Sequence, residues 1–395
     1  MSSKLKLFVE GRKEVFETLE SKINIDDKVL WFHCASLGEY EQGVPVMEAL
    51  KKQFPSYKLL VTFFSPSGYE AKKNSTLADV IVYLPMDTKS KVKRFVEIVN
   101  PELAVFVKYE FWPNYLKELH KRNIPIVMVS AAFREDQAFF KWYGGFMRKT
   151  LRTIDHFFVQ DAVSKTLLEK QAFDNVTLSG DTRFDRVSHQ IEMDNRVDFI
   201  SEFVNNRLCI VIGSSWSEDE EVFIEFINNT SKDVCFIIAP HEIKNNGVRA
   251  LQQKLSRNTV LYSEKDGIQL KDQQIFIMNT IGYLSRVYSY ADIAYVGGAM
   301  GTSGLHNILE PATFGIPIVI GKNFEKFREA KQLQKLAGLF SVANATEFSQ
   351  ILNKLIDDKK FREKTGMISG HFINSNTGAT AMILEYLENK IEEKK

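Results

Sequence analysis

Short apolar runs alternate with stretches of helical periodicity along most of the chain. The apolar runs of the first half cover residues 28–34, 59–64, 80–84, 103–107, 126–130, 156–159 and 176–178. Those of the second half cover 208–213, 234–239, 259–262, 274–278, 292–296, 317–320 and 339–342. Continuous apolar runs of this length are typical of strands buried on both faces, and intervening helices favour parallel pairing. The pattern therefore predicts an α/β fold with two parallel sheets.

The alternation is interrupted after residue 180 by a polar stretch rich in Asp and Arg. We therefore predict an N-terminal domain over residues 1–185, a linker over 186–206, a second domain over 207–375 and an amphipathic C-terminal helix over 376–395. Ligands of open α/β sheets bind beyond the carboxyl ends of the strands. The unusual loops of both halves fall at those ends, which predicts a ligand cleft faced by both domains.

Composition and charge exclude several classes of protein. Of the 395 residues, 44% are hydrophobic and 26% charged, and the net charge of +1 gives no argument for nucleic-acid binding. No apolar run approaches the roughly 20 residues of a membrane span, and residues 1–12 lack a signal-peptide core. The cysteines, Cys34, Cys209 and Cys235, fall in apolar runs, and the histidines form no HxH or HExxH motif. We therefore expect no metal site and no cofactor.

A glycine-rich loop lies between the strand expected at 292–296 and a helix expected at 305–314. Its glycines are Gly297, Gly298, Gly301 and Gly304. Glycine lets the backbone adopt positive φ and approach a ligand closely, and the first turn of the following helix offers unpaired N–H groups to a phosphate. The loop is thus a candidate phosphate site, although a plain turn between a strand and a helix would use the same residues.

Three polar residues follow this loop. His306 and Asn307 fall in the expected first turn of the helix, and Glu310 lies one turn beyond His306 on the same face. A carboxylate at that place could accept hydrogen bonds from a ribose diol while the helix start holds a phosphate.

Two further candidates follow the first strands of the second half. Ser214 and Ser215 come directly before an acidic run at 218–221, which argues against a phosphate there and leaves the serines as candidate sugar or base contacts. His241 follows the next strand. A lone histidine at a strand end is more commonly a surface residue than a catalyst.

Ser36-Leu-Gly-Glu39 connects the first strand to a helix expected at 40–52. The flexible Gly38 and the start of the helix would place Glu39 at the carboxyl edge of the N-terminal sheet. A carboxylate that faces a ligand there is a candidate general base. The alternative is that Glu39 only stabilises the helix dipole, by about 0.3–1 kcal/mol.

An unusual cluster of aromatic and basic residues lies within 133–149, where we expect a helix over 137–150. Its candidate residues are Phe139, Phe140, Lys141, Trp142, Arg148 and Lys149. Aromatic rings beside basic side chains suit the interface of an anionic membrane. The alternative is a core helix whose polar face is basic.

Several short motifs occur in an order that resembles one known family. They are Ser36-Leu-Gly-Glu39, Tyr83-Leu-Pro-Met-Asp87, Glu110-Phe-Trp-Pro-Asn114, Gly180-Asp-Thr-Arg-Phe-Asp185, Gly213-Ser-Ser215 and Gly304-Leu-His-Asn-Ile-Leu-Glu-Pro311. Each motif alone is weak, but together, over nearly the whole chain, they resemble the Kdo (3-deoxy-D-manno-octulosonic acid) transferases of lipopolysaccharide biosynthesis.

The resemblance implies a GT-B fold, with two Rossmann-like domains and the donor CMP-Kdo held mainly by the second. It implies an inverting, metal-independent transfer of Kdo to a lipid A precursor, lipid IVA, without a cofactor. It also implies peripheral contact with the anionic inner membrane of a bacterium, on the cytoplasmic face. Relatives usually begin with an apolar N-terminal anchor, and residues 1–12 do not resemble one. Either the anchor was trimmed from this sequence or the protein docks only through its aromatic and basic residues.

The resemblance also implies roles for individual residues. Glu39 matches the general base that deprotonates the acceptor hydroxyl. The donor-binding set is Ser214, Ser215, His241, Thr280, Ile281, Gly282, Ser303, Gly304, His306, Asn307, Glu310 and Lys322. Within it, Thr280-Ile-Gly282 matches a loop near the cytosine, and Lys322 is our candidate partner for the Kdo carboxylate.

The chain departs from the family pattern at Trp216, where many relatives have His, and at Pro240, where they have Arg. Ser130-Ala-Ala132 and Gly282-Tyr-Leu284 also differ, and the departures bear on the donor-phosphate contacts. Two alternatives stay open. One is another GT-B enzyme, such as a nucleotide-sugar epimerase or a different sugar transferase, and the other is a non-catalytic nucleotide-binding protein that docks on membranes.

Overall fold

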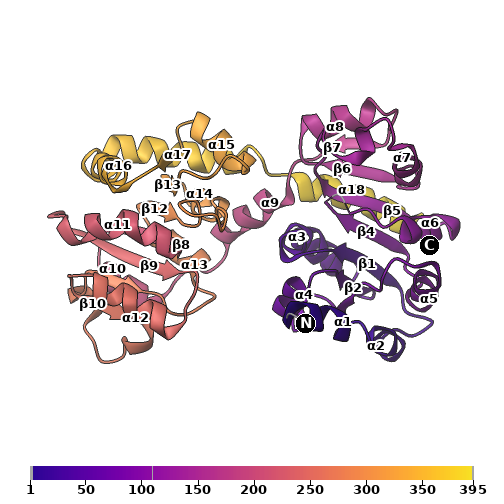
Figure 1. Ribbon diagram of the computed structural model, residues 1–395, viewed down its shortest axis with the longest axis horizontal. Coiled ribbons are helices and arrows are strands. Elements are labelled where there is room, and N and C mark those ends of the chain that lie inside the picture. Colours follow the sequence, from indigo (N-terminus) through magenta and orange to yellow (C-terminus); the bar gives the residue numbers. More distant parts are fainter. Residues whose placement is uncertain (1–2, 109, 394–395) are drawn as a thin grey trace. The chain divides into compact units, whose positions relative to one another are not determined.

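The computed structural model describes residues 3–108 and 110–393, which divide into two compact units (Figure 1). The N-terminal unit comprises the chain up to Arg186 and again from Asn376, and the C-terminal unit comprises Val187–Ser375. Each unit carries one 7-stranded sheet. The predicted α/β fold with two parallel sheets is confirmed, and each apolar run identified in the sequence corresponds to a strand.

The sheet of the N-terminal unit is built from buried apolar strands. They are β1 (Val29–Cys34), β2 (Lys58–Phe63), β3 (Val80–Tyr83), β4 (Leu103–Val107), β5 (Ile126–Ala131), β6 (His156–Val159) and β7 (Val176–Leu178). Their order is β3-β2-β1-β4-β5-β6-β7, and every described pairing is parallel. Adjacent residues of β1 enter different cores, Trp31 on one face and Phe32 on the other, because side chains alternate along a strand.

Helices cover this sheet. They are α1 (Ser3–Glu10), α2 (Val15–Lys22), α3 (Leu37–Gln53), α4 (Pro66–Lys72), α5 (Lys89–Val99), α6 (Pro113–Lys121), α7 (Gly145–Leu151), α8 (Ala162–Glu169) and α18 (Ala379–Glu392), with a 3-10 turn η1 (Ala138–Phe140). Helix α18 brings the end of the chain back to this unit and buries Ile383, Leu387 and Ile391. Asp185 fixes its start by accepting hydrogen bonds from the backbone N–H groups of Gly378 (2.5 Å) and Thr380 (2.8 Å).

The C-terminal unit repeats the architecture. Its strands are β8 (Leu208–Ser215), β9 (Val234–Pro240), β10 (Thr259–Leu261), β11 (Ile275–Ile277), β12 (Ile293–Val296), β13 (Ile318–Gly321) and β14 (Leu339–Val342), in the order β10-β11-β9-β8-β12-β13-β14. Its helices are α10 (Asp198–Val204), α11 (Ser217–Asn229), α12 (Asn245–Lys254), α13 (Leu284–Val287), α14 (Leu309–Thr313), α15 (Arg328–Lys335), α16 (Ala345–Asp357) and α17 (Lys359–Asn374). The 3-10 turns are η2 (Gln190–Glu192), η3 (Tyr262–Glu264), η4 (Leu270–Asp272) and η5 (Tyr288–Tyr290).

The segment expected as a polar linker is partly helical. Helix α9 (Thr182–His189) runs into it, and α10 lies inside it with Ile200 and Phe203 fully buried. These two apolar residues pack into the core beside β8 and β9, a contact that the polar composition of the segment did not reveal. The predicted domain limits themselves stay predictions.

In each sheet the chain crosses once from one side of its first strand to the other. In the N-terminal sheet this crossing lies between β1 and β4, and in the C-terminal sheet it lies between β8 and β12. Connections that leave two such strands turn toward opposite faces and open a crevice at the carboxyl ends. Residues directly after these four strands are therefore the first place to look for a site. Between residues 3 and 393, none of the described helices has the length and apolar composition needed to cross a bilayer.

Candidate functional site

Asp219 organises the crevice of the C-terminal sheet. It lies in the first turn of α11, is fully buried, and accepts hydrogen bonds through Oδ2 from the backbone N–H groups of Trp216 (2.9 Å) and Gly298 (2.8 Å). Its Oδ1 accepts from the Tyr295 hydroxyl at 2.7 Å. One carboxylate thus ties the start of α11 to β12 and to the glycine-rich loop. Sequence reasoning treated it only as part of an acidic run.

The glycines of the loop allow this close packing. A Cβ on Gly297 would lie 2.5 Å from the carbonyl oxygen of Ser214. Gly298 has φ of +94°, and a Cβ there would lie 2.2 Å from the carbonyl oxygen of Gly304. At Gly301 the nearest atom to such a Cβ is the carboxylate of Glu218, at 2.7 Å, which can move. Gly297 and Gly298 are therefore required by the fold of the loop, because a side chain would collide with backbone.

Asn323 holds the other side of the loop. Its backbone N–H donates to the carbonyl of Ala299 (2.7 Å), and its Nδ2 donates to the carbonyls of Met300 (3.0 Å) and Gly301 (2.9 Å). Lys322, the residue before it, is exposed and has no ion pair with any residue in the described part of the chain. An exposed cation beside a braced loop is consistent with the expectation that Lys322 meets an anion, which stays a prediction.

Three aromatic side chains stack here: Trp216 and His241 directly follow β8 and β9, and His306 lies at the end of the glycine-rich loop. The Trp216 ring lies 4.3 Å from that of His241, and the His241 ring lies 4.6 Å from that of His306. Trp216 Nε1 donates a hydrogen bond to His306 Nε2 at 3.0 Å. The structure therefore brings the predicted His241 and His306 together, and Trp216 contacts both of them. In the sequence, Trp216 stood out only as a departure from the family pattern.

This stack keeps the His306 ring neutral. Burial, and secondly the nearby His241, lower the pKa of His306 from 6.5 to about 4. The hydrogen bond from Trp216 occupies Nε2 as an acceptor, so the proton of the neutral ring lies on Nδ1. His306 can then donate from Nδ1 without carrying a charge.

The helix expected at 305–314 is shorter than predicted. Helix α14 covers only Leu309–Thr313, so His306 and Asn307 lie before it and not in its first turn. Asn307 Oδ1 accepts from the backbone N–H of Leu309 at 3.1 Å, which favours a start after Asn307. Asn307 Nδ2 also donates to Glu310 Oε1 at 3.1 Å. The loop backbone, not a helix start, is consequently the candidate phosphate contact.

The remaining donor-binding candidates lie at the end of β8 and in loops of the C-terminal unit. Ser214 adopts a left-handed backbone with φ of 54°, and Ser215 Oγ is buried without a hydrogen-bond partner among the described residues. Ser303 lies exposed in the glycine-rich loop. Thr280-Ile-Gly282 follows β11, two strands from β8, and the Ile281 side chain is 80% exposed.

Glu39 lies at the crevice of the N-terminal sheet. It sits in the first turn of α3 with 8% exposure, and its Oε2 accepts from the backbone N–H (2.5 Å) and the hydroxyl (2.6 Å) of Ser36. Its Oε1 lies 3.8 Å from Nζ of Lys108, the residue after β4. The Glu39–Lys108 pair therefore spans the crossing between β1 and β4. The contacts with Ser36 form the capping arrangement of a helix start, so the proposed catalytic role comes in addition to a structural one.

Strained backbone accumulates at the same sheet edges. Lys108, Ser130 and Ser214 have positive φ of 74°, 49° and 54° and lie at the carboxyl ends of β4, β5 and β8. Such conformations cost about 1–3 kcal/mol outside glycine and concentrate at functional sites. No sequence signal marks these conformations, because none of the three residues is glycine.

The aromatic-basic cluster does not form one helix. The turn η1 and helix α7 are separated at Gly144, where a Cβ would lie 2.2 Å from the carbonyl oxygen of Ala138. Phe139 is buried in the core, which speaks against its contact with a membrane, whereas Phe140 is only partly buried and its membrane contact stays a prediction. Arg148 Nη1 donates to the carbonyls of Phe139 (2.7 Å) and Lys141 (2.9 Å).

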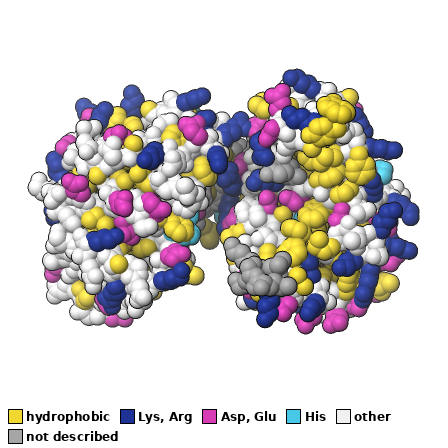
Figure 2. Space-filling view, in the orientation of Figure 1, with side chains coloured by type: hydrophobic (Ala, Val, Ile, Leu, Met, Phe, Trp, Pro, Cys, Tyr) yellow, Lys and Arg dark blue, Asp and Glu magenta, His cyan; other side chains and the backbone are white. Residues whose placement is uncertain are grey.

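Other aromatic residues of the cluster are exposed. The Trp142 side chain is 92% exposed, that of Tyr143 61% and that of Phe146 60%. Figure 2 shows hydrophobic side chains gathered over the part of the N-terminal unit where Figure 1 labels α7 and α8. The surface consisting of Lys141, Trp142, Tyr143, Phe146 and Lys149 is called the aromatic-basic surface below.

Comparisons with known proteins show what the chain is similar to. Residues 10–186 match the family model of 3-deoxy-D-manno-octulosonic-acid transferase (kdotransferase). A 3-deoxy-D-manno-octulosonic acid transferase of Haemophilus influenzae is 26% identical over 92% of this chain and 87% of its own length. One of Aquifex aeolicus is 27% identical over 87% of this chain and 91% of its own. A bifunctional glycosyltransferase/methyltransferase of Fusobacterium nucleatum is 26% identical over 92% of this chain, which spans 58% of that protein.

Solved structures agree on the fold. The UDP-GlcNAc 2-epimerase of Neisseria meningitidis has a TM-score of 0.65 at 16% identity, over 92% of this chain and 100% of that one. MurG of Acinetobacter baumannii has a TM-score of 0.58 at 12% identity, over 92% of this chain and 99% of the MurG chain. With its two parallel sheets, the protein has the α/β architecture of the GT-B fold. Residues 10–186 match the Kdo transferase family model, and most of the chain is similar to curated Kdo transferases.

Proposed function

We propose that the protein transfers Kdo from CMP-Kdo to the lipid A precursor lipid IVA, with inversion and without a metal. The observation that carries this proposal is the position of Glu39, whose side chain is nearly buried. Its carboxylate pairs with Lys108 across the crevice of the N-terminal unit, which is the unit that matches the family model. A carboxylate placed beyond the strand ends suits the task of accepting a proton from an acceptor hydroxyl. Lys108 is then a positioning residue, because its ammonium group holds Oε1 of that carboxylate.

The reaction needs one displacement. The acceptor hydroxyl gives its proton to Glu39 while its oxygen forms a bond to the anomeric carbon of Kdo. The bond from that carbon to the phosphate oxygen of CMP breaks, and CMP leaves as an anion. Attack opposite to the leaving group inverts the anomeric centre, so one base and a stabiliser for the anion suffice.

The glycine-rich loop is the candidate stabiliser of CMP. Asp219 and Asn323 fix it from two sides, so its backbone N–H groups are preorganised and lose little entropy when an anion binds. Neutral His306 adds a donor at Nδ1. The other proposed donor contacts are Ser214, Ser215, His241, Thr280, Ile281, Gly282, Ser303, Gly304, Asn307, Glu310 and Lys322, of which Lys322 would meet the Kdo carboxylate.

We propose further that the protein works at the cytoplasmic face of the inner membrane and touches it through the aromatic-basic surface. Trp142 can enter the interface while Lys141 and Lys149 approach anionic headgroups. This contact is peripheral and needs no spanning helix.

Product mass tests the proposed function. The full chain is incubated with CMP-Kdo and a tetra-acylated lipid A precursor, with and without EDTA. The proposal expects the precursor to gain the mass of one or more Kdo residues under both conditions. Conversion of a nucleotide sugar to an isomer without acceptor would favour the epimerase alternative, and absence of any product would support a non-catalytic binding protein.

A further inference from the structure

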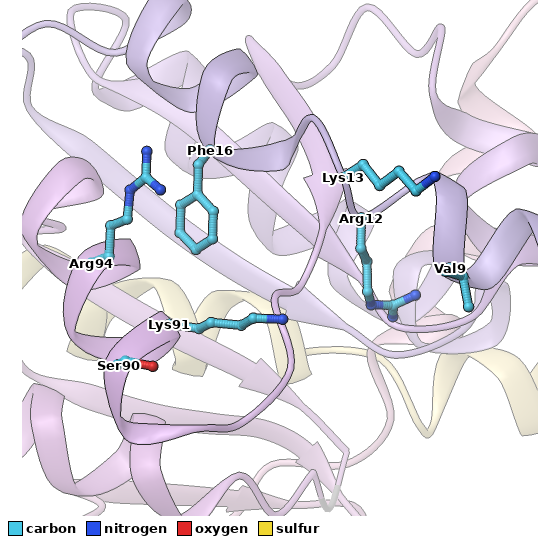
Figure 3. A pocket seen from close by; sticks show the side chains of 7 residues that line it. All are labelled: Val9, Arg12, Lys13, Phe16, Ser90, Lys91 and Arg94. Atoms are coloured by element: carbon cyan, nitrogen blue, oxygen red, sulfur yellow. The ribbon is translucent and has the colours of Figure 1, made fainter.

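A second candidate site lies in the N-terminal unit, next to the residues that follow β2 and β3. It is a pocket of about 620 Å³ between the α1–α2 turn and the start of α5 (Figure 3). The residues that line it are Val9, Arg12, Lys13, Phe16, Ser90, Lys91 and Arg94. Below it is called the basic pocket.

Positive charge is concentrated in the basic pocket. Arg12, Lys13, Lys91 and Arg94 line it, and no acidic residue is among the described residues of its wall. The chain as a whole carries 51 basic and 50 acidic residues, so an average surface would bring acids and bases in equal numbers. Four lining cations, of which only Arg94 has an acidic partner, are therefore a local feature, and they raise the local concentration of anions.

Arg12 is held in place without being neutralised. Its guanidinium donates to the carbonyls of Leu84 (Nε, 3.1 Å), Phe8 (Nη1, 2.8 Å) and Phe64 (Nη2, 2.8 Å), and it lies 3.8 Å from the Phe8 ring centroid. It forms no ion pair with any residue in the ranges that the structure describes. Burial lowers its pKa to about 10, so it remains charged at neutral pH. A half-buried cation without a counter-charge is costly, and an anion in the pocket would offset that cost.

Two lysines complete the pocket. In Figure 3, Lys91 extends from α5 toward the side on which Arg12 and Lys13 lie. Within the described residues, neither Lys13 nor Lys91 has an ion pair, whereas the neighbouring Arg94 pairs with Glu20 at 2.8 Å. Each ammonium group therefore keeps its donors available for a ligand, and Ser90 adds a hydroxyl to the lining of the same pocket.

The walls of the pocket are partly apolar. The Arg94 guanidinium lies 4.4 Å from the centroid of the Phe16 ring. On α1, the lining residue Val9 is 46% exposed, and Leu7 on the same helix is 42% exposed. Pockets of about 300–1,000 Å³ hold whole small ligands, so the space exceeds the need of a lone phosphate. Charge, volume and apolar rim together suit a phosphate that is attached to a larger, partly hydrophobic body.

We propose that the basic pocket binds a phosphate monoester group. Such a group carries close to two negative charges at neutral pH and several acceptor oxygens, which match four cations and a hydroxyl. A phosphorylated lipid and a soluble phosphate would present the same chemistry. The proposal does not depend on the proposed transfer of Kdo, because it needs only the pocket.

The test removes the two unpaired lysines and leaves Arg12, which also supports three backbone carbonyls. The K13A/K91A variant is compared with K121A/K170A, which removes the same charge from exposed positions of α6 and of the turn after α8. The probes are phosphatidylcholine vesicles that contain phosphatidic acid, vesicles with an equal amount of phosphatidylserine, and inorganic phosphate in calorimetry. Thermal melting of both variants checks that the fold is intact.

We expect K13A/K91A to bind phosphatidic acid vesicles about tenfold more weakly than the wild type, and K121A/K170A to lose clearly less. Loss confined to these vesicles supports a lipid phosphate. Loss of inorganic phosphate binding with unchanged vesicle binding supports the same site with a soluble phosphate. Equal behaviour of the two variants toward every probe would overturn the proposal.

Discussion

Asp219 accepts a hydrogen bond from the backbone N–H of Gly298 at 2.8 Å, at the crossing between β8 and β12 in the C-terminal sheet. The two residues are 79 positions apart in the chain. The same oxygen accepts from the backbone N–H of Trp216, so the loop and the aromatic stack depend on one buried carboxylate. Substitution at this position should therefore affect stability and donor binding together.

Asp219→Asn keeps the shape of the side chain but replaces one acceptor oxygen by an NH₂ group that faces N–H donors. We expect the free energy of unfolding to fall by about 2–4 kcal/mol, because charge-assisted hydrogen bonds to a buried group are lost. CMP-Kdo binding, measured by calorimetry, should weaken as the loop loosens. Glu221→Gln, an exposed change on the same helix, is the control and should alter neither quantity.

Gly298→Ala tests the conformation of the loop. The new Cβ would collide with the carbonyl of Gly304 and would occupy a backbone with φ of +94°. Strain of about 1–3 kcal/mol should weaken CMP-Kdo binding by roughly tenfold or more. Gly301→Ala is the matched control, since its Cβ meets only the movable Glu218 side chain. Equal affinities of the two variants would show that the loop does not hold the donor.

His306 predicts a pH dependence of stability. Its pKa is lowered from 6.5 to about 4 in the folded protein, so the unfolded chain binds more protons between these values. The contribution to stability is present above about pH 6.5 and is lost as the pH falls toward 4. In His306→Gln, urea unfolding midpoints should therefore change less between pH 7 and 5 than in the wild type. His371→Gln, at an exposed position of the same unit, should keep the wild-type dependence.

The aromatic-basic surface predicts membrane binding. The variant K141E/W142S/K149E should bind vesicles containing phosphatidylglycerol more weakly, because it loses an interfacial anchor and reverses two charges. Arg148 is left unchanged, since it donates to the carbonyls of Phe139 and Lys141 and supports the fold. Co-sedimentation measures the binding. A variant that binds as well as the wild type would exclude this surface as the contact.

The fold was predictable because its signal is local. Runs of buried apolar residues marked each strand, and their spacing required parallel pairing. Helix limits were less predictable, because they depend on single side chains. The Asn307 side chain delays the start of α14, and Gly144 separates η1 from α7 through its contact with Ala138.

The site was predictable only in part. Glu39 and the glycine-rich loop carry motifs, but the roles of Asp219 and Lys108 depend on contacts between distant parts of the chain. An aspartate in the first turn of a helix is indistinguishable in sequence from a residue that stabilises the helix dipole. The positive φ of Lys108 has no sequence signal either, because it is imposed by the surrounding fold.

Glu39→Gln tests the central claim most directly, through CMP-Kdo affinity and transfer rate measured on the same preparation. Glu17→Gln, another glutamate in the first turn of a helix, is the control. The account predicts that Glu39→Gln binds CMP-Kdo like the wild type while its transfer rate falls about 100-fold or more, because the amide cannot accept the proton. A variant that transfers Kdo at the wild-type rate would contradict the assignment of Glu39 as the base.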